Sequence, residues 1–492
     1  MLIRTLLPIL KTVFMIQNID IKFTICEECK GQGKKSRKVR KKIRVQYQKD
    51  LEVYQKHPTK EKEPILPKRT EYPCPSCNGT GIRKSNSFPK TKEYPKIAII
   101  GGGIGGIALG IACLHRGIPF TIYERDGSFE ERAQGYGLTL QQASKAIQGL
   151  GLFDLTNGIV SKKHVVHNTD GDILGEWGMR KWLDKKPVPN NKRNNIHIAR
   201  QELRKELLKQ LGSQECIKWN YQLIDFKDQT NVSMNFNIDG NIVTETADLI
   251  VGADGIRSSV RKLIIGDSIT PLNYLGCIVI LGICSLDKVK EKSTSLLDGE
   301  TVFQTANGNE RIYVMPFTAD KIMWQLSFPL QEEKAIDLSK KGPQALKKEA
   351  ILRTQWHSPI PDIIDKTPVI NISGYPVYDR NLLTEEHFLT ANNSTLLGDA
   401  AHPMSPFKGQ GANQALLDAL SLARKITKFC SKTSNWKENG IRQSALLEFE
   451  REMIARSKSK VKGSANAAQY LHSEIVLKEN NAPRGSNYQA KL

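Results

Sequence analysis

The chain lacks a long hydrophobic run, a strong glycine or proline bias and an even number of cysteines. No stretch of 18 apolar residues occurs in its 492 residues, so no segment is predicted to span a bilayer. Its 37 glycines and 22 prolines are too few for a collagen-like or low-complexity chain. Nine cysteines, four of them in two CxxC pairs, are not typical of a disulfide framework. We therefore expect a folded protein of a reducing compartment, with the cytoplasm favoured over the mitochondrion.

Acidic residues are scarce in the first fifth of the chain, where residues 1–95 hold 22 basic and 9 acidic side chains. The rest of the chain is only mildly basic, so any attraction for acidic partners belongs to the N-terminal part. Residues 1–24 have no small-residue cleavage site and are interpreted as a leader. A mitochondrial presequence and a start at Met15 instead of Met1 are the alternatives for this segment.

One cysteine pattern, CxxCxGxG, occurs twice, at residues 26–33 and 74–81. Each CxxC can place two thiolates on one metal ion, and the glycines allow a tight turn behind the sulfur atoms. The pattern resembles the cysteine-rich repeats of the DnaJ chaperone family, although no J-domain pattern precedes it. The resemblance implies one structural zinc ion in an element over residues 25–85. Its ligands would be Cys26, Cys29, Cys74 and Cys77.

The segment between the two cysteine motifs is strongly basic. The run from Lys34 to Arg44 has eight basic residues in eleven, and Ile43, Val45 and Tyr47 alternate with polar residues, which predicts a short strand. We interpret the run as the solvated face of a hairpin in preference to a nucleic-acid contact, because few aromatic residues for base stacking accompany it. A polar linker is expected over residues 86–93.

A βαβ unit is predicted after the linker. The apolar run at residues 96–100 leads into the glycine-rich turn GGGIGG, and a helical pattern covers Ile107 to Arg116. A second apolar run at residues 120–123 ends at Glu124. Strand, glycine turn, helix, strand and acid in this order are typical of a dinucleotide-binding unit, but they do not separate NAD from FAD.

The glycines and the acid of this unit each have a physical role. Gly101 makes the turn, Gly103 lets the main chain approach a pyrophosphate at the helix N-terminus, and Gly106 allows the helix to pack on the strand. Glu124 would hold a ribose hydroxyl.

Two further strand-to-turn motifs follow, DLIVGADGIRSSVR at residues 248–261 and TLLGDAAHPMSPFKGQGA at residues 395–412. Together with the glycine-rich turn they resemble the group A flavoprotein monooxygenases, the aromatic hydroxylases with the p-hydroxybenzoate hydroxylase fold, over about residues 94–475. The run IYERD at residues 122–126 is similar to the salicylate-hydroxylase-like and tetracycline-inactivating members. The resemblance implies FAD, bound by Gly101, Gly103, Gly106, Glu124, Arg125, Arg200, Asp254, Gly255, Asp399, Pro406, Gly409, Gly411, Ala412 and Asn413.

The fold class that this resemblance implies is α/β. A Rossmann-like FAD-binding domain would cover residues 94–265 and return at residues 381–430, with a β-rich substrate domain inserted at residues 266–380. C-terminal helices and a tail would occupy residues 431–492, and the small zinc-type element would precede the whole.

The implied activity is hydroxylation of an aromatic, phenolic or polycyclic small molecule. NAD(P)H would reduce the flavin, and O₂ would form a C4a-hydroperoxide that the substrate attacks. A flavin-fold redox sensor or docking protein with a zinc-mediated partner contact is one alternative, and an FAD oxidase or epoxidase is another. The sequence predicts neither the oligomeric state nor the substrate.

No catalytic base is predicted from the sequence. We interpret His402 as a positioning residue, since a base needs geometry that sequence does not supply. Asp254 and Asp399 each have an expected role in cofactor binding, and we prefer these roles to a general acid–base pair. Met315, Trp324 and Phe328 are interpreted as plain core in preference to an aromatic pocket.

Overall fold

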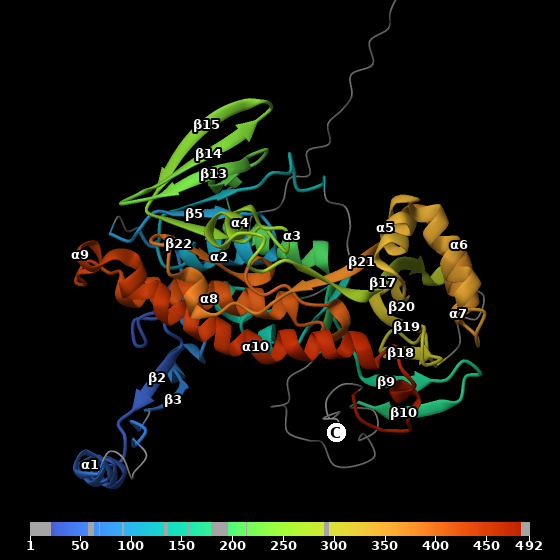
Figure 1. Ribbon diagram of the computed structural model, residues 1–492, viewed down its shortest axis with the longest axis horizontal. Coiled ribbons are helices and arrows are strands. Elements are labelled where there is room, and N and C mark those ends of the chain that lie inside the picture. The colour runs from blue at the N-terminus through green and yellow to red at the C-terminus, as the bar shows by residue number, and fades with distance from the viewer. Residues whose placement is uncertain are drawn as a thin grey trace, which may run out of the picture.

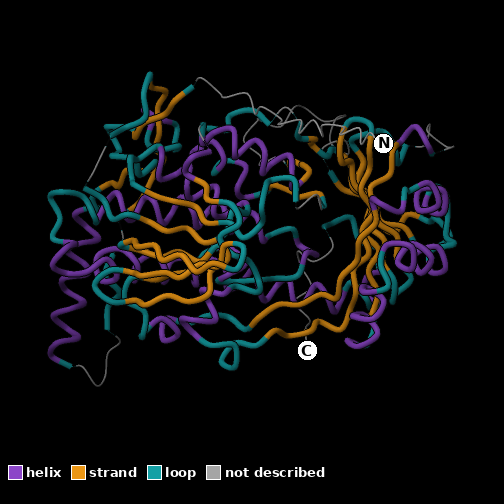
Figure 2. Tube along the Cα trace, turned by 90° about the horizontal axis from the view of Figure 1, so that it is seen from above, coloured by secondary structure: helices purple, strands orange, loops and turns teal. Residues whose placement is uncertain are grey.

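The computed structural model of the chain describes residues 21–57, 63–67, 69–90, 93–131, 136–155, 157–178, 195–212, 214–289 and 295–483. Two large sheets organise this part, one parallel and one mixed. Strands β17 (Leu272–Ser285) and β21 (Ile372–Arg380) run between the two regions (Figures 1 and 2). This mixture of sheets and helices confirms the predicted α/β class. The alternative start at Met15 and most of the predicted leader lie outside the described residues.

The first sheet is parallel and consists of short buried strands. Every residue of Ile97–Ile100 and of Leu249–Gly252 is buried, which is typical of a parallel sheet covered on both faces. Because the strands are parallel, the carboxyl ends of neighbouring strands meet at one edge, where ligands bind in open α/β sheets. In spatial order the strands are β12 (Ile217–Lys218), β6 (Phe120–Tyr123), β5 (Ile97–Ile100), β16 (Leu249–Gly252) and β22 (Ser394–Leu396).

Helices cover one face of the parallel sheet and a small antiparallel sheet covers the other (Figure 1). The Tyr123 ring of β6 stacks on Phe236 of the antiparallel sheet with ring centroids 4.5 Å apart. The predicted helix at Ile107–Arg116 begins three residues earlier and ends at Leu114. The covering elements are α2 (Ile104–Leu114), α3 (Arg200–Leu211), α4 (Ser259–Ile265), α8 (Gly411–Phe429), β13 (Gln222–Asp228), β14 (Val232–Ile238) and β15 (Asn241–Ala247).

The second sheet has seven strands, and its two faces carry different side chains. One face packs against three helices and forms a closed apolar core, and the other turns toward the parallel sheet. The alternation along each strand produces this division. The strands in spatial order are β10 (Ile173–Trp177), β9 (Lys163–His167), β18 (Thr301–Ala306), β19 (Arg311–Thr318), β20 (Lys321–Pro329), β17 and β21, and the helices are α5 (Glu332–Lys340), α6 (Pro343–Arg353) and α7 (Ile360–Lys366).

The C-terminal helices join the two sheet regions. Helix α9 (Trp436–Ile441) leads through a π-helical turn into α10 (Leu447–Tyr470), which contacts both α8 and β17 (Figure 1). Phe449 and Met453 of α10 are buried. In the described ranges, each helix is too short or too polar to cross a membrane. In a further three-stranded sheet, β11 (Ile196–Ala199) lies between β7 (Gly137–Leu140) and β8 (Ile159–Val160).

The N-terminal element consists of two antiparallel strand pairs and one helix. Strand β1 (Lys22–Ile25) pairs with β4 (Ile82–Ser85), and β2 (Lys34–Arg37) pairs with β3 (Thr70–Pro73). The helix α1 (Lys41–Lys56) projects from it, away from the two large sheets (Figure 1).

The strand predicted around Ile43, Val45 and Tyr47 is wrong, because these residues lie in α1. No residue of this helix is buried, and Ile43 and Val45 are 48% and 46% exposed. Their alternation has no sheet to pair with, whereas the many Lys, Gln and Glu side chains suit a solvated helix. The basic run is consequently divided between β2 and α1, and it stays largely exposed.

His115 lies at the interface between the N-terminal element and helix α2. Its ring is fully buried, with its centroid 5.2 Å from that of Phe23 and 6.3 Å from that of Phe88. Neither ring nitrogen has a partner among the described residues. Burial, with a smaller effect of Arg116, lowers the pKa of His115 to about 3. The folded protein therefore holds this histidine neutral.

We expect His115→Phe to stabilise the protein by about 2 kcal/mol more at pH 5 than at pH 7.5. Unfolded histidine binds a proton below a pKa of 6.5, whereas folded His115 resists protonation until its pKa near 3, so stability is lost as the pH falls through 6.5. Phenylalanine removes this loss and preserves an aromatic ring at the interface. Urea unfolding at both pH values measures the difference, and an equal effect at the two would contradict the assignment.

Candidate active site

One large cavity, of about 1140 Å³, lies between the carboxyl ends of the parallel strands and one face of the seven-stranded sheet. All three predicted turn motifs contribute to its lining, although they are far apart in the sequence. The predicted cofactor residues that line it are Gly103, Arg200, Gly255, Asp399, Pro406, Gly409, Gly411 and Ala412.

The glycine turn after β5 contains two glycines that have no room for a side chain. A Cβ on Gly101, whose φ is +109°, would lie 2.6 Å from the Ala253 carbonyl oxygen. A Cβ on Gly106 would lie 1.9 Å from the Gly101 carbonyl oxygen. Gly103 differs, because a Cβ there meets no atom within 4 Å and its φ of −77° suits any residue. The open space at Gly103 therefore lies at the N-terminus of α2, where an anion would bind.

Glu124 follows β6 and supports the glycine turn directly. Its side chain is buried, and one oxygen accepts from the Gly102 backbone N–H at 2.6 Å while the other accepts from the Asp126 N–H at 3.1 Å. Arg125, in contrast, has a side chain that is 64% exposed and lies 3.9 Å from the Asp126 carboxylate. Arg125 is outside the cavity lining, as is Glu124 before it.

Arg200 begins helix α3, and its guanidinium lies 5.5 Å from the centre of the Tyr136 ring in the cavity wall. Arg204, one turn further, was missed by the sequence analysis. It is buried, and its Nε donates to the Gly102 carbonyl at 2.9 Å while its guanidinium stacks on Phe129. The spacing of four residues from Arg200 on one helix is the signal that could have identified it.

Asp254 in the second turn caps a helix instead of facing the cavity. Its carboxylate accepts from the Ser258 hydroxyl and from the Ser259 backbone N–H at 2.7 Å, at the start of α4. Burial raises the pKa of Asp254 in spite of these hydrogen bonds. Its neighbour Gly255 lines the cavity, whereas Asp254 does not, so the structure does not support an acid pair of Asp254 and Asp399 there.

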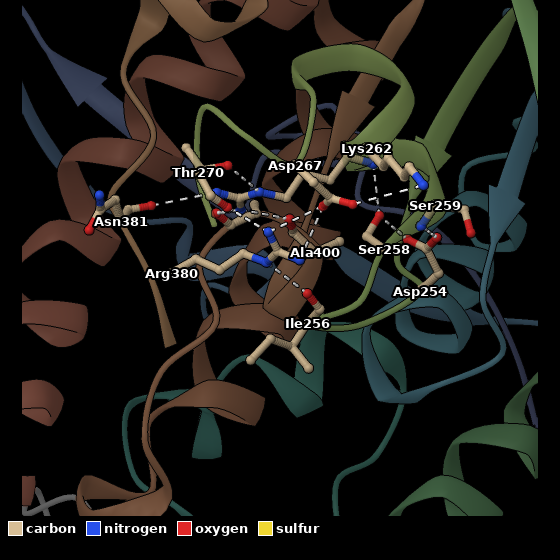
Figure 3. Close-up of polar contacts among 12 residues, drawn as sticks. Asp254, Ile256, Ser258, Ser259, Lys262, Asp267, Thr270, Arg380, Asn381 and Ala400 are labelled. Atoms are coloured by element: carbon tan, nitrogen blue, oxygen red, sulfur yellow. Dashed lines mark hydrogen bonds and ion pairs between the residues drawn. The ribbon is translucent and has the colours of Figure 1, made fainter. Parts of the chain in front are cut away.

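Arg261 connects the second turn to the third, and Arg380 connects the second turn to the end of β21. Arg261 is fully buried, and its Nη1 donates to the carbonyl oxygens of Ala400 at 3.0 Å and Ala401 at 2.8 Å. Figure 3 shows the same network, in which Arg380 Nε donates to the Ile256 carbonyl at 3.0 Å. Sequence reasoning missed both roles, although Arg261 ends the DLIVGADGIRSSVR motif, because their partners are more than a hundred residues away.

The third turn places Asp399 in the cavity wall and turns His402 away from it. Asp399 is exposed to the cavity, and desolvation by the surrounding protein raises the pKa of its carboxyl. His402 Nε2 lies 2.7 Å from Asp418 Oδ2, and the same buried carboxylate accepts from Arg456 at 2.6 Å. Since His402 is outside the cavity lining, this contact supports its interpretation as a positioning residue.

Asn413, predicted beside the flavin ring, is wholly engaged with the protein. Its Nδ2 donates to the carbonyls of Thr139 at 2.9 Å and Gly409 at 2.8 Å. Its Oδ1 accepts from the backbone N–H groups of Gln141 at 2.8 Å and Ala143 at 3.1 Å. Asn413 therefore fixes the loop before α8 to the end of β7, and its amide has no contact to offer a ligand.

The far wall of the cavity is the inner face of the seven-stranded sheet. Met315 lines the cavity, whereas Trp324 and Phe328 are fully buried on the opposite face under the helices. Trp324 Nε1 donates to the Thr367 hydroxyl at 2.8 Å. The interpretation as plain core thus holds for Trp324 and Phe328 but not for Met315. The aromatic residues that do line the cavity are Tyr136, Trp177, Tyr313, Tyr375, Tyr378 and Phe407, while Phe303 borders it from the buried core.

Arg311 on β19 is a buried cation in this wall. It is 5% exposed, its Nε donates to Gln304 Oε1 at 2.7 Å, and its guanidinium lies 5.0 Å from the Tyr313 ring centre. Burial lowers the pKa of Arg311 to about 10. Among the described residues no carboxylate pairs with it, since Glu310 pairs with Arg353 at 2.8 Å instead. The sequence signal that could have identified Arg311 is a basic residue at the start of an apolar strand.

Two histidines in the wall contribute hydrogen-bonding groups without charge. Burial lowers the pKa of His164 to about 4 and that of His197 to about 3. His197 Nδ1 lies 3.0 Å from the Thr139 hydroxyl, and its Nε2 has no partner among the described residues. Arg311 therefore dominates the charge on this side of the cavity.

A second candidate site lies in the N-terminal element, where the four predicted cysteines meet. Their sulfur atoms lie within 4.8 Å of one another, all four side chains are buried, and none forms a disulfide. The Cys29 and Cys77 sulfurs are 3.8 Å apart, the spacing expected in a tetrahedron with metal–sulfur bonds of about 2.3 Å. Backbone N–H groups of Gly33 and Gly81 donate to these two sulfurs at 3.2 and 3.3 Å. The cluster therefore fits a tetrahedral thiolate site.

The parallel sheet, the three turns at its carboxyl edge and the cavity beneath a second sheet define a dinucleotide-binding oxidoreductase fold. The family model described as FAD binding domain matches residues 94–437, which is more than half of the chain. The chain belongs to this family and is an FAD-dependent oxidoreductase. The N-terminal element lies outside the matched range.

Similar proteins agree with this assignment. The chain is 29% identical over 336 residues to the aurachin C monooxygenase/isomerase of Stigmatella aurantiaca, covering 67% of this chain and 80% of that protein. It is 27% identical over 373 residues to the chloroplastic zeaxanthin epoxidase of Oryza sativa subsp. japonica, covering 74% of this chain and only 53% of the epoxidase.

Solved structures show the same fold at lower identity. Klebsiella pneumoniae HpxO complexed with FAD and uric acid has a TM-score of 0.65 and 19% identity, and the match covers 78% of this chain and 93% of HpxO.

Proposed function

We propose that the chain is an FAD-dependent monooxygenase that uses NAD(P)H and O₂ to hydroxylate an aromatic small molecule. The observation that carries this proposal is the single cavity of about 1140 Å³, into which the three turns face from one side and an aromatic-bearing sheet from the other. Such a cavity can hold a dinucleotide and a substrate together, with the substrate against the reactive end of the cofactor.

The residues present fit FAD at the turns. Gly103 leaves the space that a pyrophosphate would fill at the N-terminus of α2. Glu124, which supports this turn through the Gly102 N–H, is proposed to hold the ribose. Asp399 and the backbone around Gly409 and Gly411 would hold the flavin end, before the N-terminus of α8. That helix end favours negative charge nearby. Bound FAD would supply the redox chemistry that NAD(P)H and O₂ require.

Arg311 indicates the substrate class. A buried guanidinium without a carboxylate partner is costly unless a ligand supplies the counter-charge. The Tyr313 ring, whose centre lies 5.0 Å from the guanidinium, provides apolar surface in the cavity lining. We therefore propose an aromatic substrate that carries an acidic oxygen, as a carboxylate, phenolate or enolate, with this oxygen on Arg311.

Epoxidation on the same fold is the second candidate, and the similarity to zeaxanthin epoxidase is what favours it. An FAD oxidase, a redox sensor and a docking protein are further alternatives. A zinc ion in the four-cysteine cluster is proposed to be structural, because four thiolates leave no open coordination position.

The deciding experiment is oxidation of NADH and of NADPH by the purified FAD-loaded protein, with and without a panel of acidic aromatic compounds. We expect a panel member to stimulate oxidation and one atom of labelled O₂ to enter it as a hydroxyl group. Label in an epoxide would favour the second candidate. A tetracycline belongs in the panel, since the tetracycline-inactivating subgroup stays a prediction. No stimulation by any compound would contradict the proposal.

A further inference from the structure

The FAD-binding part of the chain contributes two arginines to the four-cysteine element. Arg116 Nη2 donates to the Gly31 carbonyl at 3.0 Å, and Arg424 Nη2 donates to the Thr80 carbonyl at 3.1 Å. Gly31 lies in the first cysteine turn and Thr80 in the second. Each arginine therefore holds the backbone of one of the two metal-binding turns.

These arginines form no ion pair with a carboxylate in the described residues, although the charge of Glu452 acts on Arg424. Arg116 is 2% exposed, and in the described ranges neither Arg116 nor Arg424 forms an ion pair with Asp or Glu. The Nε atom of each guanidinium is buried without a hydrogen-bond partner among the described residues. A buried cation and a partly buried one, each with an unused donor, are costly without a compensating negative centre.

The cysteine cluster is that centre. A Cβ on Gly33, whose N–H donates to the Cys29 sulfur, would lie 2.8 Å from Arg424 Nη2. The Gly31 carbonyl that accepts from Arg116 belongs to the second residue after Cys29. Four thiolates around one divalent cation carry a net charge of about −2. Two guanidiniums balance this charge.

The two arginines lie at or near the C-terminal ends of the two helices that border the cavity. Arg116 lies two residues beyond α2, and Arg424 lies in the C-terminal half of α8. The N-termini of these helices, near Gly103 and Gly411, line the cavity. The cysteine element thus contacts the far ends of both cofactor helices, and Gln32 Nε2 adds a hydrogen bond to the Arg424 carbonyl at 3.0 Å.

We infer that Cys26, Cys29, Cys74 and Cys77 bind one Zn²⁺ whose charge is balanced by Arg116 and Arg424. The zinc centre is therefore shared between the N-terminal element and the FAD-binding part, and it fastens the ends of α2 and α8 together. The arginines are positioning residues that retain the metal and do not ligate it. This inference is independent of the substrate and of the reaction.

The test uses the full-length protein and variants that separate charge from hydrogen bonding. Arg116→Gln and Arg424→Gln retain a donor for the Gly31 or Thr80 carbonyl but lose the charge, whereas Arg116→Lys and Arg424→Lys retain the charge. Arg37→Met, an exposed arginine of the same element, is the control. Metal content is measured by elemental analysis, and zinc retention by the rate of zinc transfer to a chromogenic chelator. Flavin absorbance in parallel reports the fold.

We expect one zinc per chain, and we expect the four cysteine thiols of the cluster to react with a thiol reagent only after chelation. We also expect zinc transfer about tenfold faster in the glutamine variants, a rate near wild type in the lysine variants and an unchanged rate in Arg37→Met. A folded protein without zinc, or with iron in its place, would overturn the zinc assignment. Equal transfer rates in the glutamine and lysine variants would overturn the role of the two charges.

Discussion

Gly103→Val is expected to give a folded protein that has lost FAD. A Cβ at Gly103 meets no protein atom within 4 Å, and the backbone there is extended, so the protein itself has no reason to exclude a side chain. The space is proposed to be that of the pyrophosphate, so valine would fill it and remove the close approach of backbone N–H groups. We expect FAD affinity to fall at least about a hundredfold, which corresponds to roughly 2.7 kcal/mol.

Gly106→Val is the contrasting variant for this prediction. Its Cβ would lie 1.9 Å from the Gly101 carbonyl, so it should disrupt the turn and the fold together. Flavin titration by fluorescence quenching and circular dichroism of both proteins distinguish a blocked site from a broken one. Normal FAD binding by Gly103→Val would show that the pyrophosphate does not lie at this turn.

Arg311→Met is expected to weaken binding of an acidic aromatic substrate by about a hundredfold without altering FAD content. The guanidinium is buried in the cavity wall with no carboxylate partner among the described residues, so a substrate oxygen would form a charge-assisted hydrogen bond there. Such a bond contributes about 1.5–3 kcal/mol, and methionine preserves much of the volume without the charge. The readout is the KM for the stimulating compound, together with the basal NAD(P)H oxidation, which should not change.

Arg353→Met provides a matched control in the same domain. Arg353 lies on α6 behind the sheet, where it stacks 3.9 Å from the Phe328 ring centre and pairs with Glu310 and Glu349. Its loss should alter stability and not the KM. An equal KM effect in both variants would mean that the substrate does not contact Arg311.

The arrangement of the cofactor turns could be predicted from the sequence because it depends on short-range features. Runs such as Ile97–Ile100 are wholly apolar and end at glycine, which indicates buried parallel strands, and parallel strands bring their carboxyl ends together. Asp399 and Gly103 could therefore be assigned to one site although almost three hundred residues separate them.

The remaining roles depend on partners that a sequence pattern does not specify. Arg261 donates to a carbonyl oxygen more than a hundred residues away, and Arg311 has no carboxylate partner among the described residues. Asn413 is engaged by backbone atoms of residues 139–143. The helix α1 was missed for the opposite reason. Its alternation of apolar residues is a local pattern that requires a partner strand, and the structure provides none in the described residues.

The most direct test of the account is the flavin content of the freshly purified full-length chain. The protein should be yellow, with the visible absorbance of an oxidised flavin, and denaturation should release one FAD per chain. A colourless protein that stays colourless after incubation with excess FAD would contradict the central claim that three distant turns bind one FAD.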